Sequence, residues 1–354
     1  MKIVFNPKYD PRNLYPEIIV ETLEENGIFI FSLKEFFKKI SVFKEVKIVH
    51  LNWFENIIGK NFFKVRLNFF FKATAIFLLV ICRKKIIWTM HNRVPHDKEK
   101  VSIQTRLMVL LIKKSSVIIV HSNLTEQCIF DLVPISDKIR NKIRYVPHPD
   151  YINKYGNIIE SNCADKDKKL NLLFIGAVKP YKNIEILIDI VKKYPEDVTL
   201  NISGRACTEV YRKLLLERGL NSANIKYSFE FVEEKEFPDL ISKCDLFVLP
   251  YDKSSSLNSG VIMLAFSYQK CVISSEIGTV EKDELKAINL IYNYNDTGEH
   301  KSMLEKKILE AIEMKKQNKE VFSYYGKLCY DFIEKSNNSN FVCSELINIY
   351  NSLK

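Results

Sequence analysis

The sequence predicts an α/β protein of two Rossmann-like domains, each with a parallel sheet whose two faces are covered by helices. Apolar stretches of strand length alternate with helical stretches along most of the chain, as in repeated βαβ units. The length of 354 residues fits two such domains better than one. A polar stretch without periodicity, 151–169, predicts a linker between domains at 1–150 and 170–334.

Each predicted strand is a short apolar run, and most are followed by a helical pattern. We predict strands at 2–6, 46–52, 86–91, 116–121, 143–147, 171–176, 198–203, 225–229, 245–249, 271–275 and 289–292. We predict helices near 15–26, 33–40, 60–82, 100–113, 124–131, 183–194, 207–219, 234–243, 259–269, 301–318, 320–334 and 339–352. Open parallel sheets bind ligands outside the carboxyl ends of their strands, so residues just after strands are the candidates for function.

Charge and cysteine content bear on partners and compartment. The formal net charge is +10 and the pI about 9.0, which indicates attraction to anionic lipid or phosphorylated substrates, or simply a lysine-rich surface. No nucleic-acid-binding signature is present, so no nucleic acid partner is expected. The eight cysteines form no Cys-x-x-Cys pair, and no signal-peptide pattern precedes the first strand. We therefore expect reduced thiols in a cytoplasmic protein.

One apolar segment, 67–82, has two interpretations. Arg66 precedes it, Lys72 interrupts it, and its uncharged part, 73–82, is about half as long as a membrane span. A core or surface helix that leads into a parallel strand is the favoured interpretation. The alternative is a helix at the membrane surface with a basic collar, which would give the chain a peripheral contact with an anionic membrane at the inner face of the plasma membrane.

The most informative segment is 245–265, where an apolar strand ends at Pro250, a polar loop follows, and Gly260 begins a helix. The start of a helix presents free N–H groups and the positive end of the helix dipole, which suit a phosphate. We expect Asn258, Ser259 and Gly260 to bind one, with Gly260 permitting close approach. For Ser259, a helix cap alone is the alternative.

A second strand–loop–helix unit lies upstream. An apolar run at 172–175 leads into Gly176, and Lys179 and Lys182 follow in a short loop before the next helix. Two such loops on one parallel sheet could hold a diphosphate between them. Fixed cations there would stabilise the nucleoside diphosphate that leaves when a sugar–phosphate bond breaks. The pair predicts a nucleotide-sugar site, with solvated loop lysines as the alternative.

In order and spacing, these motifs resemble the donor half of GT-B glycosyltransferases close to glycosyltransferase family 4. The resemblance covers most of residues 170–285. The matching motifs of one family branch are here Gly176, Lys179-Pro180-Tyr181-Lys182, Leu249-Pro250-Tyr251, Asn258-Ser259-Gly260 and Leu264-Ala265. The resemblance implies a GT-B fold, with two domains facing a central cleft and a C-terminal helix at about 335–354 that packs back on the first domain.

The sequence departs from the family at two positions. Family 4 usually has two glutamates around the second loop, and they fall here at Ser256 and Leu264. The family implies that the first binds the sugar and the second the ribose, so these two contacts have no assigned residue. Glu276, after the strand at 271–275, is a candidate substitute.

The histidines of the first half provide candidates for contact with the sugar. His91 ends a predicted strand, and a neutral imidazole there could bond to the sugar or accept a proton from the acceptor hydroxyl. The family places a donor-sugar histidine at the equivalent strand end. A histidine that caps loop backbone is the alternative. The further expected contacts to donor or acceptor are Tyr9, Asn92, His96, His121, Gly176, Tyr251 and Glu276.

We therefore expect a hexosyltransferase-type enzyme that moves a sugar from a nucleotide-diphosphate donor to a glycan hydroxyl. The acceptor is expected to be a lipid-linked oligosaccharide in cell-surface polysaccharide assembly, and the family implies retention of anomeric configuration. No residue cluster has zinc spacing, so we expect no metal and no cofactor other than the sugar nucleotide as co-substrate. The alternatives are a nucleotide-sugar epimerase of the same fold and a non-catalytic sugar-nucleotide-binding partner subunit.

Overall fold

The fold is seen in a computed structural model, which describes residues 1–11, 13–59, 61–93, 101–159 and 169–354. The chain divides into two compact units. The first unit comprises Met1–Pro149, Ser254–Asn258 and Ser336–Lys354. The second comprises Asp150–Lys253 and Ser259–Lys335.

The first unit contains a six-stranded parallel sheet in the order β2-β1-β3-β4-β5-β6. The strands are β1 (Lys2–Asn6), β2 (Phe29–Phe31), β3 (Ile48–Asn52), β4 (Lys85–Thr89), β5 (Val117–Val120) and β6 (Ile143–Tyr145). The helices are α1 (Tyr15–Glu25), α2 (Leu33–Lys38), α3 (Ile40–Glu45), α4 (Phe62–Ile81), α5 (Val101–Lys114), α6 (Asn123–Leu132), α7 (Asp137–Arg140) and α15 (Ser339–Ser352).

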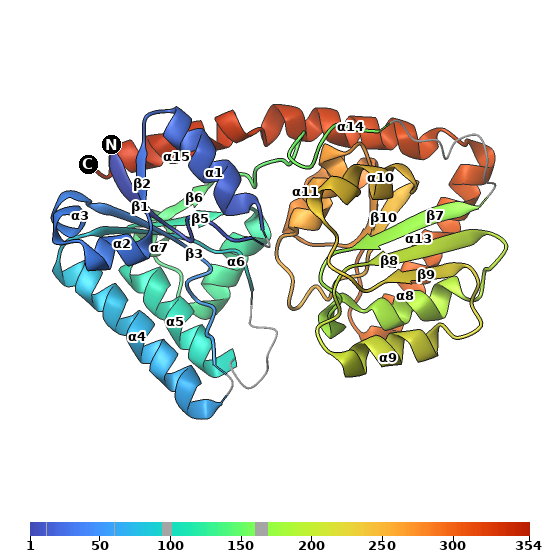
Figure 1. Cartoon of the computed structure of the whole chain (residues 1–354), viewed down its shortest axis with the longest axis horizontal. Coiled ribbons are helices and arrows are strands. Elements are labelled where there is room, and N and C mark those ends of the chain that lie inside the picture. Colours follow the sequence, from blue (N-terminus) through green and yellow to red (C-terminus); the bar gives the residue numbers. More distant parts are fainter. Residues whose placement is uncertain (12, 60, 94–100, 160–168) are drawn as a thin grey trace. The chain divides into compact units, whose positions relative to one another are not determined.

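Both faces of this sheet are buried, because alternate residues of each strand enter different cores. Ile3 and Phe5 of β1 lie in one core with apolar residues of α1 and α15. Val4, between them, lies in the other core with residues of α4, α5 and α6. Figure 1 shows α4 and α5 side by side in this unit, and α1 beside α15. The C-terminal helix is thus part of the first unit's core.

The second unit contains a six-stranded parallel sheet in the order β12-β11-β10-β7-β8-β9. The strands are β7 (Leu170–Ile175), β8 (Val198–Ser203), β9 (Ile225–Ser228), β10 (Leu246–Leu249), β11 (Val272–Ser275) and β12 (Leu290–Tyr292). The helices are η2 (Pro180–Lys182), α8 (Ile184–Val191), α9 (Glu209–Arg218), η3 (Glu234–Glu236), α10 (Phe237–Ser242), α11 (Gly260–Ser267), η4 (Gly278–Val280), α12 (Asp283–Ala287), α13 (Thr297–Gln317) and α14 (Val321–Ser336). Its sheet order places β7 and β10, the strands before the two motif loops, side by side.

The predicted α/β class and the two Rossmann-like parallel sheets are confirmed, and the differences are local. The three-residue strand β2 was not predicted, nor were the short helices α7 and α12. The helix predicted at 33–40 is α2, which begins at the capping box of Ser32 with Glu35 and ends at Lys38 because Lys39 is extended; α3, at Ile40–Glu45, was not predicted. β4 ends at Thr89 rather than at 91, so His91 lies beyond its strand.

The predicted linker begins as ordered structure. The backbone N–H of Tyr151 donates a hydrogen bond to Ser267 Oγ at 2.9 Å, and that of Tyr155 donates to the Tyr268 hydroxyl at 3.0 Å. Tyr151 is buried. Residues 151–155 are therefore fixed to α11 and its end, in the second unit.

Candidate functional site

Two glycines bring the loops after β7 and β8 into contact. Gly176 has φ +114° and Gly204 has φ +134°, a region that L side chains rarely adopt. A Cβ on Gly204 would lie 2.1 Å from the Gly176 carbonyl oxygen. The Gly176 N–H donates to the Ser203 carbonyl at 3.0 Å. Only glycine fits at position 204. The hydrogen bond to Ser203 and the close contact with Gly204 together fix the backbone of Gly176.

The loop at 179–182 is tied to the segment after β10. Pro180, Tyr181 and Lys182 form the short helix η2, and Asn183 follows in the left-handed conformation with φ 51°. Asn183 Nδ2 donates to the Pro250 carbonyl at 3.0 Å, and the Asp252 N–H donates to the Tyr181 carbonyl at 3.0 Å. The two motif loops predicted from the sequence are therefore joined by hydrogen bonds.

Lys182 is a buried cation at the junction of these loops. It is 6% exposed, and its Nζ lies 4.9 Å from the centre of the Tyr251 ring and 5.4 Å from that of Phe174. Among the described residues, no acceptor forms a hydrogen bond or ion pair with this Nζ. Burial, and secondly the charge of Lys179, lower the pKa of Lys182 to about 7.

The Lys182 ammonium also lies close to the start of α11. A Cβ built on Gly176 would be 3.4 Å from Lys182 Nζ and 3.4 Å from Cγ2 of Val261, in the first turn of that helix. The glycine, the lysine and the helix N-terminus therefore meet at one point. The aromatic rings offset part of the cost of burying the charge. An anion bound there would offset the rest.

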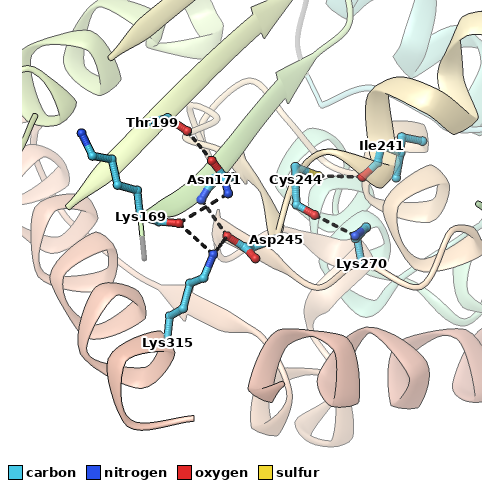
Figure 2. Close-up of polar contacts among 8 residues, drawn as sticks. All are labelled: Lys169, Asn171, Thr199, Ile241, Cys244, Asp245, Lys270 and Lys315. Carbon is cyan, nitrogen blue, oxygen red and sulfur yellow. Dashed lines mark hydrogen bonds and ion pairs between the residues drawn. The ribbon is translucent and has the colours of Figure 1, made fainter. Parts of the chain in front are cut away.

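Lys315, another buried lysine of the second unit, has the hydrogen-bond and ion-pair partners that Lys182 lacks among the described residues. Figure 2 shows Lys315 of α13, whose Nζ donates to the Lys169 carbonyl at 2.8 Å and forms an ion pair with Asp245. The same Asp245 carboxylate accepts from the Asn171 N–H at 2.7 Å. Lys315 is thus fully paired and holds α13 to the sheet. Lys182 is as deeply buried and has no such partner among the described residues.

The start of α11 is capped by Ser259. Its Oγ accepts from the Ile262 N–H at 3.3 Å, and its own N–H donates to Thr279 Oγ1 at 2.8 Å. The N–H groups of Gly260 and Val261 have no acceptor among the described residues. A Cβ on Gly260 would lie 3.0 Å from the Tyr151 hydroxyl, so a larger residue would displace that tyrosine. The helix start thus presents two free donors beside Lys182.

The other residues predicted from this half have partners of their own. Asn258 belongs to the first unit, where its Nδ2 donates to Thr125 Oγ1 at 3.1 Å. Glu276 forms an ion pair with Lys286 at 2.5 Å and accepts from Asn293 Nδ2 at 3.0 Å. Tyr251 is buried beneath the Lys182 ammonium, and Leu264 is buried in α11. Lys179 is half-buried at the start of η2.

In the first unit, three histidines and a tyrosine gather at the carboxyl edge of the sheet. His91, His121 and His148 follow β4, β5 and β6. The ring centres of His91 and His121 are 5.1 Å apart, and those of His121 and His148 are 5.6 Å apart. The Tyr15 ring lies 4.9 Å from that of His91 and 5.0 Å from that of His148.

These histidines are held neutral. Burial, and then the neighbouring histidines, lower the pKa of His91 well below its usual value and that of His148 to about 3. Burial lowers the pKa of His121 to about 4. His121 Nδ1 bonds to the Val146 carbonyl at 2.7 Å, which fixes the proton on Nδ1 and leaves Nε2 as a buried acceptor without a partner among the described residues. The cluster can accept a hydrogen bond or a proton but does not carry positive charge.

His91 is further fixed by two neighbours. Its Nε2 lies 3.1 Å from Asn52 Oδ1, so Nε2 carries the proton and Nδ1 has the lone pair. The Trp53 ring stacks on the His91 ring at 4.0 Å. Trp53 itself has φ 49°, an uncommon conformation for a bulky residue. Tyr9 is exposed, Asn92 is half-buried, and His96 lies outside the described residues.

Sequence analysis did not select two of the residues that shape these sites, Trp53 and Gly204. Each comes directly after a strand, so the rule that located His91 also applies to them. No group of three or more His, Cys, Asp or Glu side chains in the described part of the chain is placed to hold a metal ion.

The fold and a family match define the class of protein. Residues 169–312 match the family described as "Glycosyl transferases group 1". The structure resembles that of Anabaena Alr3699/HepE, solved with UDP and glucose, with a TM-score of 0.69, 14% identity and coverage of 99% of this chain and 100% of that one. A glycosyltransferase from Rickettsia africae has a TM-score of 0.64 and 12% identity, covering 99% and 98% of the two chains. The chain is a glycosyltransferase with the GT-B fold.

Two relatives by sequence carry the same name, GDP-mannose:glycolipid 4-beta-D-mannosyltransferase, and both are from Xanthomonas campestris pv. campestris. One is 24% identical over 262 residues, which cover 72% of this chain and 68% of the relative. The other, from a named strain, is 33% identical over 104 residues, which cover 29% of each chain.

Proposed function

We propose that this enzyme transfers a sugar from a nucleoside-diphosphate donor to a hydroxyl of a lipid-linked glycan, as a step in cell-surface polysaccharide assembly at the cytoplasmic side of the membrane. The family match over 169–312 supports the transfer reaction. The name of the relatives, which act on a glycolipid, supports the acceptor class. The resemblance of the motif loops to those of family 4 supports a nucleoside-diphosphate sugar as the donor.

The observation that carries the proposal is the buried ammonium of Lys182, which has no acceptor among the described residues. When the bond between sugar and phosphate breaks, negative charge grows on the leaving diphosphate. A fixed cation and the free N–H groups of Gly260 and Val261 stabilise that charge more in the transition state than in the bound donor. Because both groups are in place before the donor binds, little reorganisation is needed.

In the first unit, His91 is the proposed base or sugar ligand. Its lone pair is on Nδ1, because Asn52 accepts from Nε2. Its low pKa makes it a weak base in the free enzyme, so we assign it a hydrogen bond to a sugar or acceptor hydroxyl, with the proton passing finally to the leaving phosphate. This division of roles needs no carboxylate at Ser256 or Leu264.

The stereochemical course has two competing expectations. The family resemblance implies retention, whereas the name of the Xanthomonas relatives specifies a β-linked mannose. If the donor of this chain carries an α-linked sugar, a β-linked product requires inversion. Nuclear magnetic resonance of the product anomer, recorded with a purified lipid-linked acceptor and again with EDTA present, decides between the two and tests the expected independence of a metal.

The donor site is tested by thermal unfolding with UDP, GDP, ADP and CMP. One nucleoside diphosphate at about 100 times its dissociation constant should raise the unfolding free energy by roughly 2.7 kcal/mol. Lys182→Met should abolish this shift. It should leave the ligand-free protein as stable as the wild type or more so, because the buried charge has no protein partner among the described residues.

Lys315→Met is the matched control for a buried lysine. It removes one partner of a buried ion pair, so the free protein should lose roughly 3–5 kcal/mol of stability while its nucleotide-induced shift is kept. The donor site fails if no nucleotide shifts the wild type, or if Lys182→Met retains the shift. Loss of stability in Lys182→Met comparable to that in Lys315→Met would assign Lys182 a structural role instead.

A second candidate function is a non-catalytic sugar-nucleotide-binding subunit, favoured by the absence of both family glutamates. It predicts a nucleotide-induced shift without transfer to any of a broad set of lipid-linked acceptors. A sugar nucleotide converted without any acceptor would instead favour an epimerase.

A further inference from the structure

Helix α4 has an apolar outer face that no described residue covers. We define the α4 outer face as Phe63, Leu67, Phe70, Phe71, Phe77, Leu78 and Ile81, whose side chains are between 40% and 77% exposed. They are separated by three, four or seven residues, which places them along one side of the helix, with exposed Thr74 among them. Isolated exposed apolar residues are ordinary, but a row with four phenylalanines on one helix face indicates an interaction surface.

The helix cannot bury this face by rotating. Its opposite side is already in the core of the first unit, where Val65, Ala75, Ile76 and Leu79 are buried. Lys72, on the same helix, is tied to the loop before it, because its Nζ donates to the Phe54 carbonyl at 3.0 Å and the Asn56 carbonyl at 2.6 Å. The outer face is therefore held towards the exterior of the first unit.

The charged side chains of α4 itself are all positive. α4 contains no Asp or Glu, and Lys64, Arg66, Arg83 and Lys85 are exposed along it or just after it. The Arg66 guanidinium lies 4.3 Å from the Phe62 ring centre, and Lys114 Nζ of α5 lies 5.6 Å from the Phe77 ring centre. Cations thus border the aromatic row at its start and in its C-terminal part.

We propose that the α4 outer face binds the surface of an anionic lipid bilayer, with the helix lying in the plane of the interface. A helix of 20 residues extends about 30 Å, so the row can insert among acyl chains while the cations reach lipid phosphates. No helix among the described residues is long and apolar enough to cross a bilayer. The proposal rests on α4 alone and does not depend on the proposed transferase activity.

Vesicle flotation of the full chain tests this surface. At 50 mM salt, wild type should float with phosphatidylcholine vesicles that contain 30% phosphatidylglycerol and not with pure phosphatidylcholine, and 500 mM salt should weaken the binding. Phe63→Ser/Phe70→Ser/Phe71→Ser should reduce partitioning at least tenfold at both salt concentrations. Lys64→Gln/Arg66→Gln/Arg83→Gln/Lys85→Gln should cost about fivefold per cation at low salt only.

The matched control removes three exposed apolar side chains from the second unit, in Val210→Ser/Leu220→Ser/Tyr324→Ser, and should float like the wild type. Wild type that stays out of anionic vesicles at 50 mM salt overturns the proposal. So does a Phe63, Phe70 and Phe71 variant that floats as well as wild type. If wild type is a dimer that stays out of vesicles and this variant is a monomer, the face is an interface between copies, and the membrane proposal is wrong.

A conservative variant keeps the test open if the triple variant fails to fold. Phe71→Trp adds an indole on the outer face, while of the two native tryptophans Trp88 is fully buried and Trp53 is half-buried and stacked on His91. Its fluorescence should shift to shorter wavelength with anionic vesicles and be quenched by brominated lipid more than that of the wild type. Equal quenching of variant and wild type would contradict insertion of this face.

Discussion

At the scale of single residues, the proposed donor site of the second unit depends on Lys182, whose charge has no counter-ion among the described residues. Lys182 and Lys315 are both buried, but their ammonium groups differ in the groups that they contact. Lys315 has a carboxylate and a backbone carbonyl, whereas the Nζ of Lys182 has two aromatic rings and no acceptor among the described residues. A protein retains an unpaired buried cation at a cost to its stability, so such a group marks the place where an anion binds.

The lowered pKa of Lys182 predicts a pH-dependent affinity for nucleotide. In the protein without nucleotide, Lys182 has a pKa of about 7. A bound diphosphate raises this pKa, so nucleotide binding above pH 7 takes up a proton. Affinity for the nucleoside diphosphate should therefore fall as pH rises from about 7 to 9. Lys182→Arg stays charged throughout and should bind with little dependence on pH.

Isothermal titration in two buffers of different ionisation enthalpy measures this proton uptake directly. Wild type should show it at pH 8, and Lys182→Arg should not. An affinity of the wild type that is constant between pH 7 and 9 would mean that Lys182 is already fully protonated in the free protein.

At the scale of elements, glycines determine how closely the donor loops approach. The β7 and β8 loops touch through backbone alone, because Gly204 has no Cβ to hold the Gly176 carbonyl away. The position of Gly176 in turn leaves room for the Lys182 ammonium and the first turn of α11. The proposed donor site thus consists of strand ends and a helix start, with the Lys182 ammonium between them.

Gly204→Ala should therefore damage both stability and nucleotide binding. An alanine at 204 would be strained at φ +134°, and its Cβ would overlap the Gly176 oxygen. Together these effects should lower the unfolding free energy by roughly 2–4 kcal/mol. Gly27→Ala is the control, since Gly27 has φ +75° and open space around it, and only conformational strain of about 1–2 kcal/mol is expected.

Denaturant unfolding and nucleotide titration of both variants provide the comparison. Gly27→Ala should bind nucleotide like the wild type. Equal losses of stability in the two variants, or unimpaired nucleotide binding by Gly204→Ala, would show that close approach of the two loops does not matter.

At the scale of the whole molecule, the two units differ in their buried ionisable groups. Besides buried His91 and His121 and half-buried His148, the first unit buries His50, whose ring nitrogens bond to the Tyr350 hydroxyl and Thr89 Oγ1, both at 2.7 Å. Burial, and then His121, lower the pKa of His50 to about 3. The Tyr350 contact ties α15 to β3, so the neutral form of His50 is part of what holds the C-terminal helix.

Acid should destabilise the first unit through these histidines. In the unfolded chain a histidine takes up a proton near pH 6.5, whereas buried His50 takes one up only near pH 3, so between these values the unfolded state binds more protons. The unfolding free energy should fall as pH falls through this window, by up to about 1.4 kcal/mol per pH unit for each such histidine.

His50→Gln should remove one histidine's share of this slope. This slope is measured by urea unfolding of the first unit between pH 7 and 5, with hydrogen exchange of the amides in α15 and β3 as the readout. A variant with the same pH dependence as the wild type would show that His50 is already charged in the folded state or still buried and neutral in the unfolded one.

The sequence by itself determined the class of fold, the two parallel sheets, and most strands to within a few residues, because parallel strands buried on both faces are continuous apolar runs. It also located the Gly176, Lys179–Lys182 and 258–260 loops, since strand ends and helix starts have local signals. It missed β2, α3, α7 and α12, which are too short for any period to be visible.

Only the tertiary structure decided which lysine lacks a partner. Lys182 and Lys315 both occur in polar, lysine-containing stretches of the sequence, and what separates them in the fold is the position of Asp245, far away along the chain. In the same way, Trp53 stacks on His91 and Tyr15 packs against three histidines because strand order brings their loops together. Such contacts depend on residues distant in sequence, and local patterns carry no information about them.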